Sequence, residues 1–209
     1  MERIIEPELL DHIDPQSSEA RRSRFDLRLI NFLMGGERWI LDEIGQHPEI
    51  RRVLELGAGE GWLAQRIAHR YPQLEVLALD QVPAPPDLGS GVEWIQGDVM
   101  EQSTHCGAET LVVANMFLHH FDEEQLGRIG AAYGGAGVWL CHEPLRTRAT
   151  LNLARCMLPF VGAVTRHDML VSIRAGFVEC ALGEQLAESC QWDEQRSVFG
   201  GLRSKAVRR

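Results

Sequence analysis

The spacing of apolar residues predicts that the chain begins with helices. The stretch SSEARRSRFDLRLINFLMG, residues 17–35, carries apolar residues at helical spacing, opposite a face rich in arginine. The apolar positions are Phe25, Leu29, Phe32 and Leu33. We expect a helix that starts at a serine cap, mostly buries this stripe and ends at two glycines. The next stretch, ERWILDEIGQH at 37–47, predicts a second helix that Pro48 terminates.

From residue 52 onward the pattern changes to short apolar runs, which predict strands. The runs cover residues 53–56, 75–80, 92–95, 110–115 and 138–143. Helical patterns at 61–71 and 123–133 separate some of these runs, and continuous runs such as LVVA suit a parallel sheet covered on both faces. The connections 81–91 and 100–109 leave little room for a helix, so we expect a turn or short 3₁₀ segment in each.

The remaining residues complete an α/β pattern. Two further helices are predicted around 148–158 and 168–176, and the end of the chain reads as two strands joined at Gly200 and Gly201. We therefore predict a doubly wound α/β domain over residues 51–209 with a terminal antiparallel hairpin. Residues 1–50 are expected to form a helical cap or lid.

A glycine-rich turn after the first strand is the main candidate for a binding site. In VLELGAGEGW the glycines stand at Gly57, Gly59 and Gly61, and Trp62 occupies the place of the third glycine in a dinucleotide fingerprint. Glu55 precedes the turn, where a carboxylate repels a pyrophosphate but suits a cation. A nucleoside that carries an ammonium and a sulfonium and no phosphate meets both conditions. That nucleoside is S-adenosylmethionine.

Polar residues after the next strands fit the same cofactor. Asp80 ends the second strand and can accept hydrogen bonds from two ribose hydroxyls. Asp98 can accept from an adenine amino group, with Val99 or Met100 packed on the ring, and Asn115 would lie near the methionine part. Each residue also has a structural alternative: the glycines as a plain strand–helix turn, Asp80 as a helix cap, and Asp98 as a turn former.

Four motifs in order resemble those of the class I S-adenosylmethionine-dependent methyltransferases. They are VLELGAGEGWLAQRIA, LALD, QGD and LVVANMFLHHFDEEQL, and they lie between residues 50 and 145. The segment ANMFLHHF is similar to small-molecule methyltransferases of quinone and polyketide pathways. The segments SRFDLRLINFLMGGERWI, EPLRTR and VTRHDMLVSIRAGF resemble a bacterial subgroup associated with type III polyketide synthases. Asn115-Met116-Phe117-Leu118 stands where methyltransferases of amino groups in macromolecules carry Asn-Pro-Pro-Tyr or Asp-Pro-Pro-Tyr.

The resemblance implies a Rossmann-like, seven-stranded, mostly parallel sheet with a terminal antiparallel hairpin. It also implies a set of cofactor-binding residues. They are Glu55, Gly57, Ala58, Gly59 and Gly61 on the methionine side, Asp80 and Gln81 at the ribose, Asp98 and Val99 at the adenine, and Asn115 on the methionine side.

Histidines are the candidates for a general base, because methyl transfer to oxygen requires removal of a proton near neutral pH. His119 and His120 follow the fourth strand, and His167 with Asp168 is expected to open a later helix. Packing or helix capping is the alternative for each. His142, at the end of the fifth strand, is a weaker candidate for the base, and a core position is its alternative. The spacing of histidines and acids matches no metal motif such as HExxH, and no metal is expected.

A second set of residues is predicted to bind the acceptor. Arg146 and Arg174 can hold an anionic group, with a solvated position as the alternative. In the cap, the candidates are Phe25, Leu29, Phe32, Met34 and Trp39. For most of these five residues, we expect a position on the buried apolar face and not in the acceptor site.

Composition narrows the class of protein. The 209 residues carry a formal net charge of −9, which disfavours a nucleic-acid substrate, although basic residues cluster in EARRSRFDLR and GLRSKAVRR. No apolar run reaches the length of a membrane span, the first residues do not read as a signal peptide, and the five cysteines are scattered, so we expect a cytoplasmic protein with reduced thiols.

The predicted function is methyl transfer from S-adenosylmethionine to a small or lipid-like aromatic or polyketide acceptor, at oxygen or carbon. A non-catalytic domain that binds this cofactor and a nicotinamide-dependent oxidoreductase are the alternatives. The sequence does not predict the oligomeric state.

Overall fold

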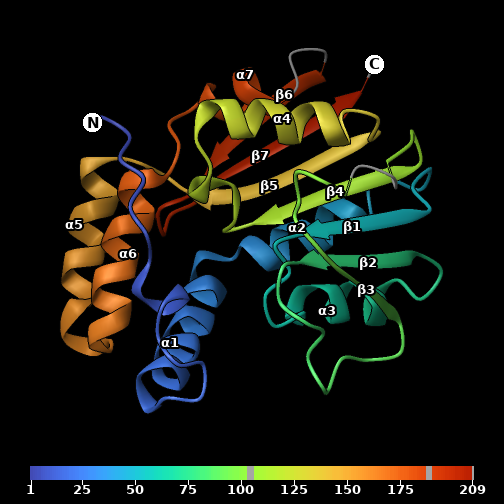
Figure 1. Cartoon of the computed structure of the whole chain (residues 1–209). Coiled ribbons are helices and arrows are strands. Elements are labelled where there is room, and N and C mark those ends of the chain that lie inside the picture. Colours follow the sequence, from blue (N-terminus) through green and yellow to red (C-terminus); the bar gives the residue numbers. More distant parts are fainter. Residues whose placement is uncertain (103–105, 187–189, 209) are drawn as a thin grey trace.

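A single seven-stranded sheet forms the centre of the molecule. The computed structural model describes residues 1–102, 106–186 and 190–208. The strands are β1 (Arg52–Leu56), β2 (Glu75–Asp80), β3 (Val92–Gln96), β4 (Thr110–Asn115), β5 (Val138–Pro144), β6 (Cys190–Arg196) and β7 (Gly201–Arg208). Their order in the sheet is β3-β2-β1-β4-β5-β7-β6, and β7 runs antiparallel to both β5 and β6 (Figure 1). The predicted Rossmann-like sheet with a terminal antiparallel hairpin is confirmed.

Helices cover both faces of the sheet, which is why its central strands are apolar throughout. On one face lie α2 (Gly36–Ile44) and α3 (Trp62–Arg70), which pack on alternate residues of the strands such as Val53 and Val113. On the other face lie α4 (Glu123–Tyr133) and α7 (Ala181–Leu186), which pack on the residues in between, such as Leu54 and Val112.

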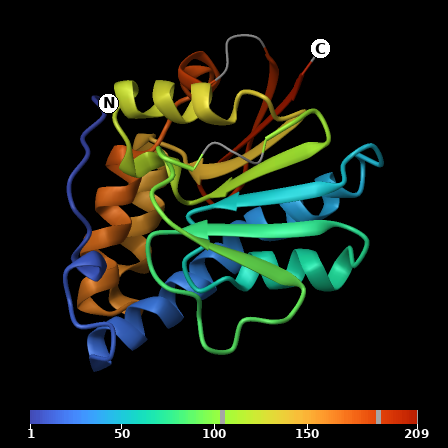
Figure 2. The same ribbon diagram turned by 45° about the vertical axis from the view of Figure 1, so that its right-hand side comes forward.

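A third helical group stands beside the ends of the parallel strands. It consists of α1 (Ser18–Met34), α5 (Arg148–Met157) and α6 (Ala163–Ala175), which share an apolar cluster that includes Ile30, Ala154 and Met169. Figures 1 and 2 show these three helices together at one side of the sheet, with the N-terminal segment running along α6. Loops that follow β1, β4 and β5 therefore open toward this helical group.

The prediction of the buried face of α1 was wrong. Phe25 is 57% exposed and Phe32 is 74% exposed, and Leu29 and Leu33 are exposed too. The helix instead buries its opposite side against α6, where Asp26 accepts hydrogen bonds from the Gly162 N–H at 2.7 Å and the Thr165 hydroxyl at 3.2 Å. Because those partners lie more than 130 residues away, apolar spacing within the helix does not indicate them.

Most other elements agree with the sequence. The connection 81–91 contains no helix, as expected, whereas part of the predicted connection 100–109 lies outside the described residues. The later helix begins at Ala163, five residues before the predicted start, so His167 and Asp168 lie inside α6 and do not open it. The short helix α7 was not predicted. The described part of the chain also contains three 3₁₀ helices: η1 (Leu9–Asp11), η2 (Leu118–His120) and η3 (Leu158–Phe160).

The division of the chain at residue 50 stays a prediction. Within the predicted cap, α1 packs on α6, but Ile40, Leu41 and Ile44 of α2 belong to the core on the sheet. Among the described residues, no helix has the length and apolar character needed to cross a membrane.

Candidate functional site

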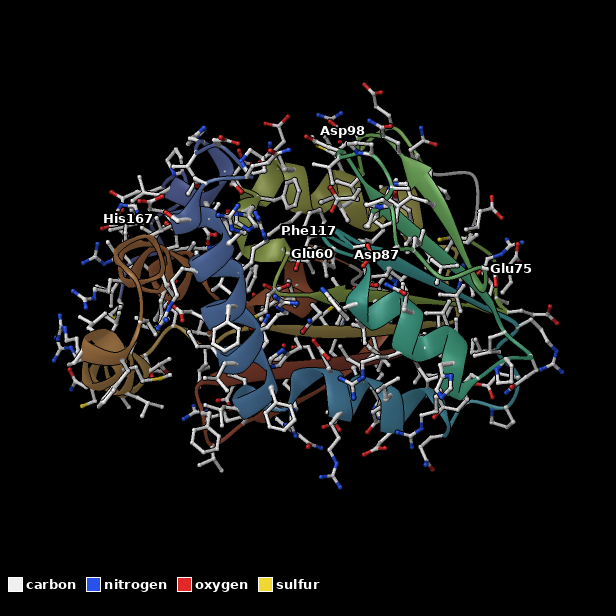
Figure 3. The ribbon with its side chains drawn as sticks, turned by 90° about the horizontal axis from the view of Figure 1, so that it is seen from below. Glu60, Glu75, Asp87, Asp98, Phe117 and His167 are labelled. Carbon is white, nitrogen blue, oxygen red and sulfur yellow. The ribbon has the colours of Figure 1, made fainter. Side chains whose placement is uncertain are left out.

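The turn between β1 and α3 has the backbone geometry of a ligand loop. Gly57, Gly59 and Gly61 have φ values of 68°, 56° and 69°, in the left-handed region that glycine adopts without strain. A Cβ at Gly59 would meet nothing within 4 Å, so space is open above the middle of the turn. At Gly57, a Cβ would come within 2.0 Å of the Phe117 ring, which therefore lies directly against the turn. Figure 3 places Phe117 and Glu60 close to one another, between the N-terminal helix and the strands.

Asp80 connects the glycine turn to the end of β2. Its carboxylate accepts a hydrogen bond from the Gly59 N–H at 2.7 Å and one from the Val82 N–H at 3.1 Å. Each oxygen still has a free lone-pair direction that can accept from a hydroxyl. Gln81 is exposed next to it, and its backbone carbonyl accepts from the Gln96 side chain at 3.2 Å.

Glu55 lies below the turn in an apolar setting. It is only 4% exposed, and its Oε2 has no hydrogen-bond partner among the described residues. Burial, together with the nearby charge of Glu37, raises the pKa of Glu55 to about 8, although the Ala64 N–H opposes the shift. A buried carboxyl with an unused oxygen favours a cation in its vicinity, because a positive charge offsets the cost of ionising it.

Asp98 and Asn115 also occupy the ends of strands, as expected. The Asp98 carboxylate caps its own turn by accepting from the Met100 N–H at 2.8 Å, while Val99 is buried and its carbonyl accepts from the Tyr133 hydroxyl at 2.7 Å. The Asn115 Oδ1 is 2.9 Å from His142 Nδ1. Asp98 therefore acts as a turn former, which was the alternative to cofactor binding, and it also lies at the crevice.

His142 is a core residue that fixes Asn115. Its ring is fully buried between two close backbone segments, since a Cβ at Gly36 would lie 2.0 Å from Nδ1 and one at Gly201 would lie 2.4 Å from Nε2. Burial lowers the pKa of His142 to about 4. The neutral ring donates its Nδ1 hydrogen to Asn115 and thereby orients the amide at the end of β4.

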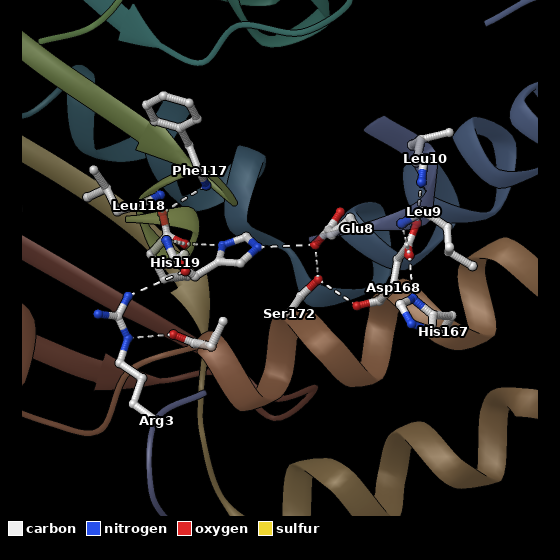
Figure 4. Close-up of polar contacts among 12 residues, drawn as sticks. Arg3, Glu8, Leu9, Leu10, Phe117, Leu118, His119, His167, Asp168 and Ser172 are labelled. Atoms are coloured by element: carbon white, nitrogen blue, oxygen red, sulfur yellow. Dashed lines mark hydrogen bonds and ion pairs between the residues drawn. The ribbon is translucent and has the colours of Figure 1, made fainter. Parts of the chain in front are cut away.

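The loop after β4 is organised by a buried glutamate that the sequence analysis did not use. One oxygen of Glu143 accepts from the Phe117 N–H at 3.0 Å and the Leu118 N–H at 2.8 Å. The other oxygen lies 2.8 Å from His119 Nδ1 (Figure 4). Met116, just before this loop, has a φ of 57°, an uncommon value for a residue with a side chain.

His119 lies between two carboxylates. Its Nε2 is 3.5 Å from Oε1 of Glu8, and its Nδ1 faces Glu143. Burial alone would lower the pKa of His119, but the hydrogen bonds and charges of Glu143 and Glu8 outweigh burial and raise it to about 9. Near neutral pH the ring is therefore protonated and has no free nitrogen with which to take a proton from an acceptor.

His120 has the opposite character. Its ring centroid is 4.2 Å from that of His119, and burial together with the neighbouring positive charge lowers its pKa to about 4. His120 is therefore neutral near pH 7. His167 is half exposed, and its Nδ1 is 2.9 Å from Asp168.

The N-terminal segment crosses this loop and α6. Arg3 donates to the carbonyls of Ala175 at 2.7 Å and Phe121 at 2.8 Å. Asp168 accepts from the N–H groups of Leu9 at 2.7 Å and Leu10 at 3.0 Å (Figure 4). We call residues 1–11 the N-terminal arm. The sequence offered no local signal for it, because its partners lie more than 100 residues away.

A small apolar cavity lies between α1, α5 and α6, next to the end of β4. Its apolar lining includes Ile30, Met34, Met116, Ala154, Met169 and Ile173, and its polar lining consists of Asn31, Thr150 and Ser172. Its volume is about 60 Å³. Met116 connects it to the loop that packs on the glycine turn.

Three of the predicted acceptor-binding residues are engaged elsewhere, whereas the candidate Met34 lines the cavity. Arg146 donates to the carbonyls of Gly176, at 2.9 Å, and of Met1, and Arg174 approaches Glu6 at 4.0 Å. Trp39 packs on the core between α2 and the sheet, with the Arg203 guanidinium 5.9 Å from its ring. None of the three lines the cavity.

Known proteins resemble this chain in fold and not in sequence. The sequence matches no family model and no curated protein. The plantazolicin methyltransferase BpumL in complex with S-adenosylhomocysteine superposes with a TM-score of 0.71 at 11% identity, over 93% of this chain and 92% of that one.

Two longer proteins also share the fold at low sequence identity. Human N-acetylserotonin methyltransferase in complex with S-adenosylmethionine has a TM-score of 0.57 at 17% identity, over 95% of this chain and 61% of its own. An O-methyltransferase family protein from Burkholderia thailandensis has a TM-score of 0.56 at 16% identity, over 93% of this chain and 64% of its own.

The fold is that of the class I methyltransferases.

In a methyltransferase fold the ligand crevice lies at the carboxyl ends of the parallel strands, as it does in other open α/β sheets. The structure brings the glycine turn, Glu55, Asp80, Asp98 and Asn115 to this edge of the sheet. It places His119 and His120 beside the same edge and His167 farther away on α6, toward the outer side of the molecule (Figure 3).

Proposed function

We propose that this protein is an S-adenosylmethionine-dependent methyltransferase. The observation that carries the proposal is the open glycine turn, flanked by the buried carboxyl of Glu55 and by Asp80, at the crevice of a methyltransferase fold. The unpartnered oxygen of Glu55 and the open space above Gly59 fit a ligand that is cationic and carries no phosphate.

Each part of the cofactor has residues that would hold it. The residues proposed for the methionine part are Glu55, Gly57, Ala58, Gly59, Gly61 and Asn115, and those for the nucleoside part are Asp80, Gln81, Asp98 and Val99. The bound cofactor supplies an activated methyl group. The remaining task of the protein is therefore to orient an acceptor and to manage its proton.

The cavity beside Met116 is our proposed acceptor site. Its lining is largely apolar, and its polar groups, Asn31, Thr150 and Ser172, are neutral. Such a surface favours a small or lipid-like aromatic or polyketide acceptor over a charged one. The cavity volume of about 60 Å³ is far below the roughly 300–1,000 Å³ of ligand pockets, so we infer that α1, which forms one wall, moves to admit the acceptor.

The histidines have different parts in the proposed reaction. His119 is protonated and held by Glu143 and Glu8, so we assign it to positioning the loop. His120 is neutral but has a lowered pKa, which makes it a weak base. We infer that the acceptor hydroxyl or ring carbon is already acidic, as in a phenol or an enol, because such a group needs little help in losing its proton. His167 is a weaker candidate for the base, because it is half exposed on α6 and lies away from the edge of the sheet where the glycine turn is.

Two alternatives have less support. A nicotinamide-dependent oxidoreductase would place a pyrophosphate beside Glu55, where its negative charge would make ionisation of this buried carboxyl still more costly, whereas a cation would favour it. A non-catalytic domain that binds the same cofactor would not require a cavity next to the crevice.

The five cysteines are free thiols in the structure, which favours the expected cytoplasmic location.

Filling the cavity tests the acceptor assignment. Ala154 lines the cavity, whereas Ala149, on the same helix, is exposed. We expect Ala154→Phe to lower turnover of a phenolic acceptor at least about tenfold, with unchanged binding of S-adenosylhomocysteine. The matched control Ala149→Phe should keep full turnover. The measurement is release of S-adenosylhomocysteine across a panel of phenolic and polyketide acceptors, and equal turnover of both variants would refute the assignment.

A further inference from the structure

Three side chains from two distant segments converge beside the loop after β4. Glu8 comes from the N-terminal arm, and His119 and His120 come from η2. One oxygen or nitrogen atom from each of the three lies within 4.8 Å of the other two. These atoms are hard or intermediate donors of the kind that bind divalent transition metals.

The orientation of His119 matches that of a metal-binding imidazole. Its Nδ1 donates to Glu143 at 2.8 Å, which fixes the tautomer and directs Nε2 toward Glu8. The side chain is 3% exposed, and its buried Nε2 faces Oε1 of Glu8 at 3.5 Å, an ion-pair distance longer than a well-formed hydrogen bond. Metal-binding histidines in proteins are arranged in the same way, with one ring nitrogen bonded to a carboxylate and the other directed at the metal site.

Glu8 is held in place in a similar way. The Ser172 hydroxyl lies within hydrogen-bond distance of the same Oε1 that faces His119 and of the Asp168 carbonyl, at 2.7 Å, and these two acceptors share its single hydrogen (Figure 4). The arm carrying Glu8 is anchored next to it by the bonds from Leu9 and Leu10 to Asp168. The carboxylate is therefore oriented by groups on α6.

The separation of one donor pair suits a small tetrahedral ion, and the donor atom of His120 lies within 4.8 Å of both members of that pair. Bonds of about 2.0–2.1 Å in tetrahedral geometry separate neighbouring donor atoms by about 3.4 Å. The observed separation of His119 Nε2 and Glu8 Oε1 is 3.5 Å. Two histidines and one carboxylate leave a fourth position open for water.

We propose that Glu8, His119 and His120 bind a divalent transition-metal ion of the Zn²⁺ type. The ion joins the N-terminal arm to the loop after β4, and it replaces the proton that otherwise holds His119 between Glu8 and Glu143. Because Ser172 contacts Glu8 and also lines the cavity, the ion stabilises one wall of the proposed acceptor site. The metal site does not depend on the proposed methyl transfer.

The test uses the full-length protein after treatment with a chelator. Calorimetric titration with ZnCl₂ should give one site with a dissociation constant in the micromolar range or below, and Zn²⁺ should raise the melting temperature. Glu8→Gln and His120→Gln should each weaken binding at least about tenfold. Co²⁺ should give the visible spectrum of a tetrahedral site in the wild type and lose it in both variants.

A matched control separates the site from weak surface binding. His69 is exposed in the last turn of α3, and His69→Gln should leave Zn²⁺ binding unchanged. Failure of the wild type to bind Zn²⁺, or equal binding by the wild type, Glu8→Gln and His120→Gln, would overturn the proposal. Titration of the same samples with S-adenosylhomocysteine shows whether each variant is folded and keeps the cofactor site, independently of the metal.

Discussion

Asp80 illustrates how one side chain can serve both the fold and a ligand. Its carboxylate fixes the Gly59 N–H and the Val82 N–H, so it shapes the turn that would receive the cofactor. From its place in the sequence, Asp80 is predicted to bind the ribose, with helix capping as the alternative. In the structure the Asp80 carboxylate accepts hydrogen bonds from backbone N–H groups, as a capping residue does. Its ribose-binding role remains a proposal.

Replacing Asp80 separates the two roles. We expect Asp80→Ala to weaken binding of S-adenosylhomocysteine by about 1–3 kcal/mol, because charge-assisted hydrogen bonds to the ribose are lost. Asp193→Ala, which removes an equal charge from exposed β6, should leave affinity unchanged. Calorimetric titration of folded variants is the measurement. An Asp80→Ala protein that binds as tightly as the wild type would remove the ribose assignment.

Glu55 is expected to make stability depend on pH. Its pKa is about 8 in the folded protein, because burial disfavours its charge, and about 4.3 in the unfolded chain. Between these values the folded state holds the extra proton, so stability falls as pH rises through this range. Glu55→Gln removes the titrating group, and its stability relative to the wild type should therefore be higher at pH 9 than at pH 5, by more than about 1 kcal/mol.

Urea denaturation at the two pH values measures this difference. Glu93→Gln provides the control, since Glu93 is exposed on β3 and its replacement should produce no such change. If Glu55→Gln and the wild type lose the same stability between pH 5 and pH 9, then the Glu55 carboxyl does not hold its proton in the folded state.

Between neighbouring elements, a glycine on α4 determines how closely α7 can approach. A Cβ at Gly130 would lie 1.7 Å from the Leu186 carbonyl oxygen, whereas a Cβ at Gly127, one turn earlier, would meet nothing within 4 Å. The two positions therefore form a natural pair for testing the packing of the short helix that the sequence did not reveal.

Alanine at these two positions should have opposite effects on stability. Gly130→Ala is expected to cost about 1–3 kcal/mol, because α7 must move away from α4. Gly127→Ala should be neutral or stabilising by up to about 1 kcal/mol, because alanine favours a helix. Thermal or urea unfolding measures both. A Gly130→Ala protein as stable as Gly127→Ala would contradict the close contact.

The same elements show what a local pattern can and cannot predict. The strands and α3 and α4 were predicted correctly because their apolar runs and the glycines that bound them lie within each segment. In the structure, a capping box of Asp122 and Gln125 adds a further local signal at the start of α4. The buried face of α1 was wrong because Asp26 binds Thr165 and Gly162 of another segment. The start of α6 was misplaced because Gly162 serves as its cap with no side-chain signal.

Across the whole molecule, the crevice was predictable and the cavity was not. Residues that end parallel strands must meet at one edge of a sheet, so the order of Glu55, Asp80, Asp98 and Asn115 in the sequence was sufficient. The cavity combines α1, α5 and α6, and the cluster around His119 adds Glu8 from the N-terminal arm. Contacts between segments more than 100 residues apart leave no periodic trace in the sequence.

Ligand choice is the most direct test of the central claim that the crevice binds a cationic nucleoside without phosphate. The measurement is calorimetric titration of the purified protein with S-adenosylhomocysteine, with NAD and NADP titrated in parallel. We predict that S-adenosylhomocysteine binds in the micromolar range and that neither nicotinamide cofactor binds. Binding of a nicotinamide cofactor, or of none of the three ligands, would contradict the account.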